Sequence, residues 1–334
     1  MAIYEYIWVD KSGRCRSKVK VADDITEWNF DGSSTGQNIG NDTEVILKPV
    51  FLRRSPFPTE DFLVLCELDL PESIKDDPLP GFNTRRWAST VAEKYKDREA
   101  WFGCEQEYTI LDPVTKKPYG MEENNFTKQG DFYCAVGYPY SQQSELVREH
   151  FTLCKEMGLK ICGFNAEVMA GQWEFQIGPA DLLTVADDMI FARYILYRLS
   201  TKYKVEISFE PKLLKEWNGS GCHINFSTKE MRDEHGIIHI NSAVDKLEKD
   251  HPKILGMYGD NSNRLTGEHE TSSADRFTTG IGTRNTSIRI PSNVVADQRG
   301  YFEDRRPASD IDPYLALGSL LQVIVSANIE DDGL

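Results

Sequence analysis

Two pairs of glutamates in strand-like surroundings are the residues of this chain best suited to metal chemistry. Glu105 and Glu107 are separated by one residue in an aromatic run, and Glu167 and Glu174 stand at the two ends of a segment that reads as strand–turn–strand. Alternate residues of a strand point to the same face of a sheet. Carboxylates gathered on one apolar face repel each other and lose solvation, so a positive partner must join them. Hard divalent cations are the simplest such partner.

Each pair could instead lie solvated on the outer face of a sheet, and this is the more frequent arrangement for either pair taken alone. The sequence around the four acids is aromatic and is not rich in lysine or arginine, which favours the metal interpretation. The aromatic neighbours are Trp101, Phe102, Tyr108, Trp173 and Phe175.

A histidine and a further acid extend the candidate ligand set. His223 follows the glycine-rich segment 218–222 at the start of another alternating run, and Glu303 shortly precedes Arg305 and Arg306. A single histidine in such a run is more often a satisfied core residue, so its value lies in its combination with the acids. Five glutamates and one histidine could hold two hard cations and leave coordination positions for phosphate oxygens.

Runs of apolar and alternating residues predict the elements that carry these side chains. A proline-rich connector is expected over residues 71–81, and a helix is expected from about Asn83, which would be its N-cap. Further helices are predicted over residues 144–157, ended by Gly158, over 179–203 and over 313–327. The last of these carries no charge along its length, so it should be deeply buried or lie at an interface. Strands are predicted over residues 4–9, 18–21, 45–50, 62–68, 102–111, 160–168, 173–177, 205–209, 222–227 and 286–290.

Strand runs that are interrupted by helices without strict alternation indicate the α+β class. A length of 334 residues suggests two domains, which we place at residues 1–82 and 83–334. The net charge of −15 argues against nucleic acid or an anionic membrane as a partner. The sequence shows neither an 18-residue apolar run nor a leader pattern, so a cytoplasmic location is expected. The seven cysteines lack Cys-x-x-Cys spacing and are expected to be reduced.

Several long motifs make the chain resemble the glutamine synthetase family in its eukaryotic (type II) branch. The likeness covers nearly the whole chain. The motifs lie at residues 28–34, 165–175, 218–223, 265–271, 287–291 and 303–307. The resemblance implies a small β-grasp-like N-terminal domain at residues 1–82 and a larger catalytic domain with a curved antiparallel sheet backed by helices. It also implies ATP-dependent ligation of ammonia to the γ-carboxylate of L-glutamate through γ-glutamyl phosphate, which gives L-glutamine, ADP and phosphate.

The resemblance further assigns residues to the parts of such a site, which needs at least two Mg²⁺ or Mn²⁺ ions and ATP as co-substrate. Glu105, His223 and Glu303 would hold one ion near the nucleotide, and Glu107, Glu167 and Glu174 would hold the other near glutamate. The implied catalytic residues are Asp31, Glu270, Arg284 and Arg305. The implied glutamate-binding residues are Asn218, Gly219, Arg264, Arg284 and Arg305. The implied ATP-binding residues are Trp101, Glu105, Asn225, Ser227, Arg284 and Arg289.

Some of these residues have ordinary alternative explanations when they are considered alone. Asp31 begins an Asp-Gly-Ser-Ser segment that would normally be a polar turn, Arg284 and Arg289 could be surface arginines, and Trp101 could be core. In the resembling family the residue matching Asp31 serves the neighbouring subunit, within pentameric rings that stack into a decamer. Two alternatives within the fold are a γ-glutamyl ligase for a larger amine and an inactive structural relative. The presence of Asp31 and Glu270 favours ammonium, and the complete ligand set argues against an inactive protein.

Overall fold

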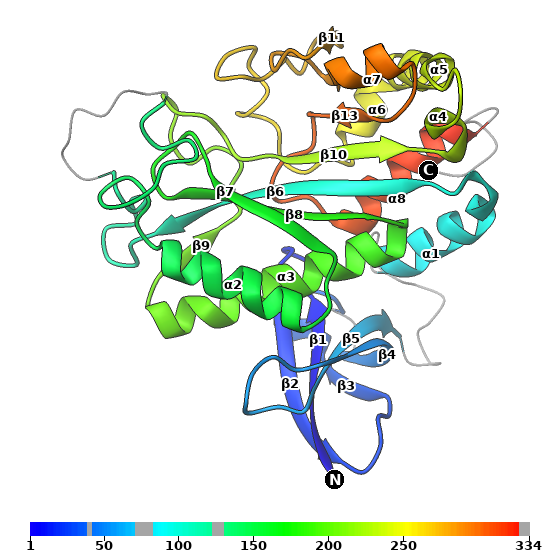
Figure 1. The fold of residues 1–334 in the computed structure, drawn as a ribbon. Coiled ribbons are helices and arrows are strands. Elements are labelled where there is room, and N and C mark those ends of the chain that lie inside the picture. Colours follow the sequence, from blue (N-terminus) through cyan, green and yellow to red (C-terminus); the bar gives the residue numbers. More distant parts are fainter. Residues whose placement is uncertain (39–41, 71–82, 122–129, 327–334) are drawn as a thin grey trace.

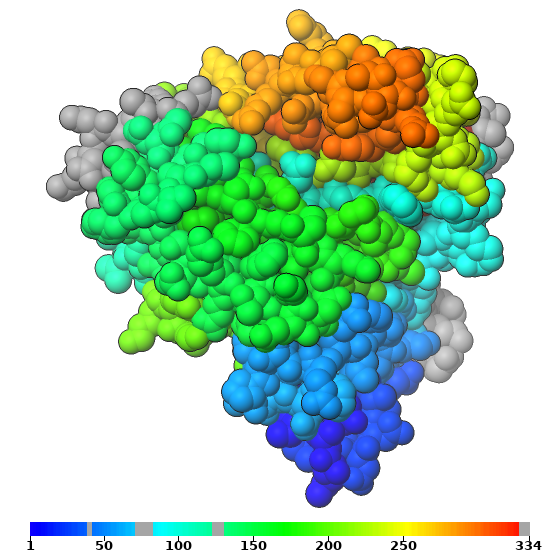
Figure 2. Space-filling model, in the orientation of Figure 1, coloured from blue at the N-terminus to red at the C-terminus, as the bar shows by residue number. Residues whose placement is uncertain are grey.

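The computed structural model describes residues 1–38, 42–70, 83–121 and 130–326. The polypeptide forms an N-terminal five-stranded sheet and a larger eight-stranded sheet with helices, in agreement with the expected α+β class (Figure 1). Figure 2 shows the N-terminal sheet as a narrow lobe beneath a wider body. The predicted connector at 71–81 lies outside the described residues, so the division of the chain at residue 82 stays a prediction.

The N-terminal sheet is mixed, with strand order β2-β1-β5-β4-β3 and a parallel pair, β1 and β5, at its centre. Alternation along β1 sends Tyr4, Tyr6 and Trp8 into a small aromatic core, whereas Ile7 packs with the core of the larger unit. Each face of this sheet therefore packs into a different hydrophobic core. Its strands are β1 (Ala2–Val9), β2 (Cys15–Ala22), β3 (Trp28–Asp31), β4 (Glu44–Arg54) and β5 (Phe62–Asp69).

The larger sheet is curved and antiparallel except for one parallel pair, β11 and β12 at its edge. Its order is β11-β12-β13-β10-β6-β8-β7, and β9 pairs with the end of β6. The predicted curved antiparallel sheet is thus confirmed. The strands are β6 (Trp101–Leu111), β7 (Ile161–Ala166), β8 (Gln172–Ala180), β9 (Glu206–Ser208), β10 (Cys222–Ser227), β11 (Thr279–Ile281), β12 (Ile288–Ile290) and β13 (Phe302–Asp304).

Helices cover one face of this sheet, and the apolar residues of its central strands point toward them. Cys104, Tyr108 and Phe175 belong to the same buried cluster as Ala192 and Leu196 of the longest helix. The intervening residues of the same strands face the other way, and these are the acids of the candidate site. The helices are α1 (Thr84–Lys94), α2 (Ser144–Glu156), α3 (Leu182–Tyr203), α4 (Lys229–Arg232), α5 (Ile237–Lys249), α6 (His251–Leu255), α7 (Ser292–Asp297) and α8 (Pro313–Val325), with 3-10 turns η1 (Gly32–Thr35) and η2 (Lys96–Arg98).

Capping side chains explain where several of these helices begin. Asn83 accepts a hydrogen bond from the Arg86 amide at 3.1 Å, which confirms it as the cap of α1. The prediction that a helix starts at residue 179 is wrong, because Pro179 still belongs to β8. Asp181 instead caps α3 by accepting the Thr184 amide at 3.1 Å.

The uncharged helix α8 is almost entirely buried, as its composition predicts. It packs against α1, α3 and α5, so it holds the helical layer together. The short strands β3, β11 and β13 were not predicted, because three or four residues are too few to display a period. Helices α4 to α7 were not predicted either, and none of them has a side chain that caps its N-terminus.

Candidate active site

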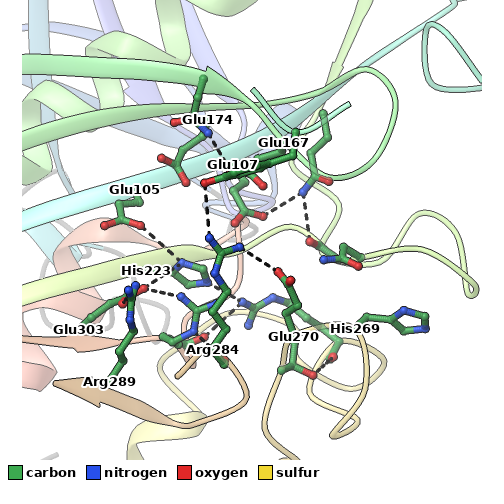
Figure 3. Close-up of a pocket in the computed structure, with 18 of the residues that line it drawn as sticks. Glu105, Glu107, Glu167, Glu174, His223, His269, Glu270, Arg284, Arg289 and Glu303 are labelled. Carbon is green, nitrogen blue, oxygen red and sulfur yellow. Dashed lines mark hydrogen bonds and ion pairs between the residues drawn. The ribbon is translucent and has the colours of Figure 1, made fainter. Parts of the chain in front are cut away.

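Strand register brings the predicted ligands together on the face of the sheet that the helices do not cover. On the central strand β6, Glu105 lies opposite His223 of β10, and Glu107 lies opposite Glu174 of β8. On the other side of β10, Asn225 pairs with Glu303 of β13. Figure 3 shows the side chains of Glu105, Glu107, Glu174, His223 and Glu303, which come from strands β6, β8, β10 and β13, converging on one pocket.

The first cluster contains Glu105, His223 and Glu303, whose nearest ligand atoms all lie within 4.8 Å of one another. The Nδ1 atom of His223 is 3.7 Å from a Glu105 oxygen and 3.5 Å from a Glu303 oxygen. Burial, followed by the charge of Arg305, lowers the pKa of His223 well below its usual value. The imidazole is therefore neutral near pH 7 and is chemically able to donate a lone pair to a cation.

The second cluster contains Glu107, Glu167 and Glu174, again with one oxygen from each within 4.8 Å. Burial is the main cause that raises the pKa of Glu107 to about 7, of Glu167 to about 8 and of Glu174 to about 10. Repulsion by neighbouring glutamates adds to each increase. Three buried carboxylates at such a spacing need protons or a cation, and an all-oxygen donor set fits a hard divalent ion.

Arginines supply positive charge on the side of the first cluster. Arg289 donates to Glu303 at 3.1 Å, and Arg305 donates to the other oxygen of the same carboxylate. Arg264 is buried, and burial lowers its pKa to about 10. Its Nη2 atom lies 3.3 Å from Nε2 of His223, on the ring side opposite the acids. A Cβ at Gly221 would lie 2.4 Å from that guanidinium nitrogen, which explains the need for glycine in this turn.

Glu270 and Arg284 approach the pocket from loops opposite the sheet. Arg284 donates to Glu270 at 3.3 Å and its guanidinium lies 5.4 Å from the ring centre of Tyr133. His269 and Glu270 have positive φ angles of 52° and 63°, a strained backbone for residues other than glycine. Thr271 stabilises this turn because its hydroxyl donates to the Glu268 carbonyl at 2.8 Å.

The cavity between the sheet and these loops has a volume of about 170 Å³, and a neighbouring cavity has a volume of about 390 Å³. Glu105 and Gln176 line both cavities, so the two adjoin. The first cavity is lined by every predicted metal ligand and by Asn218, Gly219, Arg264, Glu270, Arg284, Arg289 and Arg305. Trp101, Asn225 and Ser227 line the second cavity.

Asp31 is the one predicted site residue that lines neither cavity. It lies at the end of β3 in the N-terminal sheet, is fully exposed, and caps η1 by accepting the Ser33 amide at 3.0 Å. Hydrogen bonds from Ser33 and neighbouring hydroxyls lower its pKa. It is therefore an ionised carboxylate at neutral pH that lies outside both cavities of its own chain.

Sequence reasoning missed six residues of the first cavity, which are Tyr133, Asn165, Gln172, Gln176, His269 and Thr271. Asn165, His269 and Thr271 belong to the motifs of the resemblance but were given no role in the site. The two glutamines are two positions before and after Glu174 on the same strand, and this spacing places them on its face. That period was the signal that could have found them. Tyr133 comes from a long loop whose sequence offers no comparable signal.

Comparisons with known proteins agree with this geometry. Residues 82–247 match the family described as glutamine synthetase, catalytic domain. The glutamine synthetase of Eremothecium gossypii is 45% identical over 97% of this chain and 90% of its own length. Those of Saccharomyces cerevisiae and Schizosaccharomyces pombe are 44% and 43% identical, over 97% and 96% of this chain and 90% and 91% of their own lengths.

Within the described residues, none of the helices combines the length and the apolar composition that a membrane crossing requires. The relatives match nearly the whole chain, and the acids, histidine and arginines that the sequence predicts for the site meet in one pocket. The chain therefore belongs to the glutamine synthetase family, in its eukaryotic branch, and is an enzyme of the glutamate–ammonia ligase type.

Proposed function

We propose that this chain catalyses the ATP-dependent ligation of ammonia to the γ-carboxylate of L-glutamate through γ-glutamyl phosphate, with glutamine, ADP and phosphate as products. The observation that carries this proposal is the pair of ligand clusters on one sheet face, beside two adjoining cavities. A reaction that joins two anions requires concentrated positive charge, and the site provides the ligands and arginines for it.

The donor sets fit two divalent cations, which we take to be Mg²⁺ or Mn²⁺. Glu105, His223 and Glu303 would hold the ion near the nucleotide phosphates, and Glu107, Glu167 and Glu174 the ion near glutamate. When bound, such ions neutralise the carboxylate and phosphate oxygens that must approach each other.

The arginines and polar residues would bind and orient the substrates. Arg284 and Arg289 line the first cavity and would face the phosphoryl group, where a bidentate guanidinium stabilises the charge on the group in transfer. Asn218, Gly219, Arg264 and Arg305 would bind glutamate, and Trp101, Asn225 and Ser227 would bind the nucleotide in the larger cavity. The positions of these residues in the walls of the two cavities support both assignments.

Ammonium must be captured and then deprotonated before it attacks. Glu270 lies on the loop side of the pocket and would close over the intermediate, thereby protecting the acyl phosphate from water. Asp31 would accept the proton, and since it lines neither cavity of its own chain we infer that it serves the adjacent subunit. Head-to-tail contacts of this kind close into rings, so we propose pentameric rings that stack into a decamer.

We also propose a division into an N-terminal domain over residues 1–82 and a catalytic domain over 83–334, and a cytoplasmic location. The separate aromatic core of the N-terminal sheet supports the division. The seven free thiols, all within the described residues, support a reducing compartment.

The function is tested by measuring phosphate release from ATP and L-glutamate, with and without ammonium, in a buffer containing Mg²⁺ or Mn²⁺. We expect release to depend on ammonium and glutamine to form in equal amount. Greater activity with methylamine or a larger amine would instead identify a γ-glutamyl ligase, and the absence of turnover with every amine would indicate an inactive relative.

A further inference from the structure

Four of the five candidate metal-binding carboxylates accept a hydrogen bond from a side-chain amide. The donors are all neutral and all lie on the strands that carry the acids or next to them. The pairs are Asn225 with Glu105 at 2.7 Å, Gln172 with Glu107 at 2.9 Å, Asn165 with Glu167 at 2.8 Å and Gln176 with Glu174 at 2.7 Å.

In three of these pairs the amide holds one carboxylate oxygen and leaves the other for a cation. Glu105 accepts through Oε1, while its Oε2 is the atom that faces His223 at 3.7 Å. Both contacts of Glu107, from Gln172 and from the Gly221 amide at 2.8 Å, fall on Oε2. Glu174 accepts through Oε1 alone. Glu167 differs, because the Val168 amide also donates to its second oxygen at 3.2 Å.

The orientation of these amides is set by their other contacts. The Nε2 group of Gln172 also donates to the Gly219 carbonyl at 3.1 Å, and its Oε1 accepts the Met169 amide at 3.3 Å. A carbonyl can only accept and a backbone amide can only donate, so the amide oxygen and nitrogen of Gln172 cannot exchange places. The fold also makes room for Gln176, because a Cβ at Gly163 would lie 2.4 Å from its Oε1 atom.

The way a carboxylate is held decides which cation it can bind well. Ca²⁺ takes about 6–8 oxygen ligands at about 2.3–2.6 Å and readily uses both oxygens of one carboxylate. Mg²⁺ requires near-octahedral geometry at about 2.0–2.1 Å and usually takes one oxygen from each carboxylate. A carboxylate that is fixed through one oxygen is therefore suited to the smaller ion.

We propose that the amides of Gln172, Gln176 and Asn225 are specificity-determining, because they confine Glu107, Glu174 and Glu105 to single-oxygen ligation and so select Mg²⁺-sized cations over Ca²⁺. This inference rests on the proposed function, because it assumes that the two clusters bind metal. The charge of the metal and the identity of its ligands do not explain why these amides contact the carboxylates, whereas a role in metal selectivity does.

The test is to measure the dissociation constants of Mg²⁺ and Ca²⁺ by titration calorimetry on the full chain and on Gln176→Met, which keeps side-chain length and removes the donor. We expect Mg²⁺ binding to weaken about 10-fold or more. Ca²⁺ binding should weaken much less or improve, so that the ratio of the two constants falls. Asn165→Ala is a comparison variant. The Val168 amide still holds the second oxygen of Glu167 in it, so the ratio of the two constants should change less than in Gln176→Met.

Gln298→Met is the matched control, because Gln298 is exposed and its amide donates to the Val295 carbonyl far from any ligand. It should leave both constants unchanged. Equal weakening of the binding of both ions in Gln176→Met would overturn the inference, since that is what a merely structural role predicts. Failure of the wild-type chain to bind Mg²⁺ would overturn the metal assignment itself, which is a separate outcome.

Discussion

Glu107 and Glu174 lie directly opposite each other on strands β6 and β8, although 66 positions separate them in the sequence. The two carboxylates share a buried cluster with Glu167, and burial raises the pKa of both. This pairing concentrates negative charge at one point of the sheet.

Replacement of Glu174 should abolish synthesis without unfolding the protein. In Glu174→Ala the second cluster loses a ligand, while the buried repulsion among the remaining acids falls. We expect the melting temperature without metal to stay the same or rise. The increase on adding Mg²⁺ should become smaller, because only the first cluster keeps all its ligands. Each bound ion contributes about 2.7 kcal/mol at a metal concentration of 100 times Kd. Turnover near that of the wild type would contradict the ligand assignment.

Replacement of Asp31 should slow only the ammonium-dependent step. Asp31→Ala removes an exposed acid from a turn, so ATP and glutamate binding should be preserved. We expect kcat to fall by about 10²–10⁴, the usual contribution of a positioned acid or base, and the KM for ammonium to rise. Asp24→Ala, which alters another exposed acid of the same sheet, serves as the control. Unchanged turnover and ammonium saturation would leave Asp31 with a structural role only.

Two inactive variants should complement each other if the site is shared between subunits. Mixing Asp31→Ala with Glu174→Ala and allowing subunit exchange should restore part of the activity, because some interfaces then join an intact Asp31 to an intact Glu174. Native mass spectrometry should show five or ten copies in the assembly. A fully active monomer, or proven exchange without recovered activity, would refute the shared-site proposal.

The buried imidazole of His150 should make the fold sensitive to mild acid. It lies in the core with its Nε2 atom 3.0 Å from the Ala192 carbonyl, and burial lowers its pKa to about 4. An unfolded histidine has a pKa of about 6.5, so the unfolded chain takes up a proton that the folded chain refuses. The contribution of His150 to the free energy of unfolding is therefore fully present above about pH 6.5 and is lost as the pH falls from there toward about 4.

The measurement is the free energy of unfolding in denaturant at pH 7.5 and pH 5.5 for the wild type and His150→Gln. The glutamine retains a donor for the Ala192 carbonyl and does not titrate. The free energy of unfolding of His150→Gln should fall less between the two pH values than that of the wild type, by about 1 kcal/mol, since one unit of pKa shift corresponds to about 1.4 kcal/mol. Equal losses would show that His150 does not control acid sensitivity.

The amino-acid sequence by itself determined what depends on near neighbours along the chain. Glu105 and Glu107 share a face because alternate residues of a strand must do so, and Asn83 caps α1 because its side chain reaches a free amide of the first turn. Uncharged α8 had to be buried. The assignment of the family also required only the motifs, since they are long and span the chain.

Only the tertiary structure decided which distant residues meet. The register that places His223 opposite Glu105 joins positions more than one hundred residues apart, and no local period encodes it. Glu174 becomes buried, and its pKa rises, only once β6, β7 and β8 have paired. The same pairing fixes the side chain of Gln176, which donates a hydrogen bond to one oxygen of Glu174. The same holds for the position of Asp31, because only the fold shows that it lies exposed in the N-terminal sheet, outside the cavities that the other predicted site residues line.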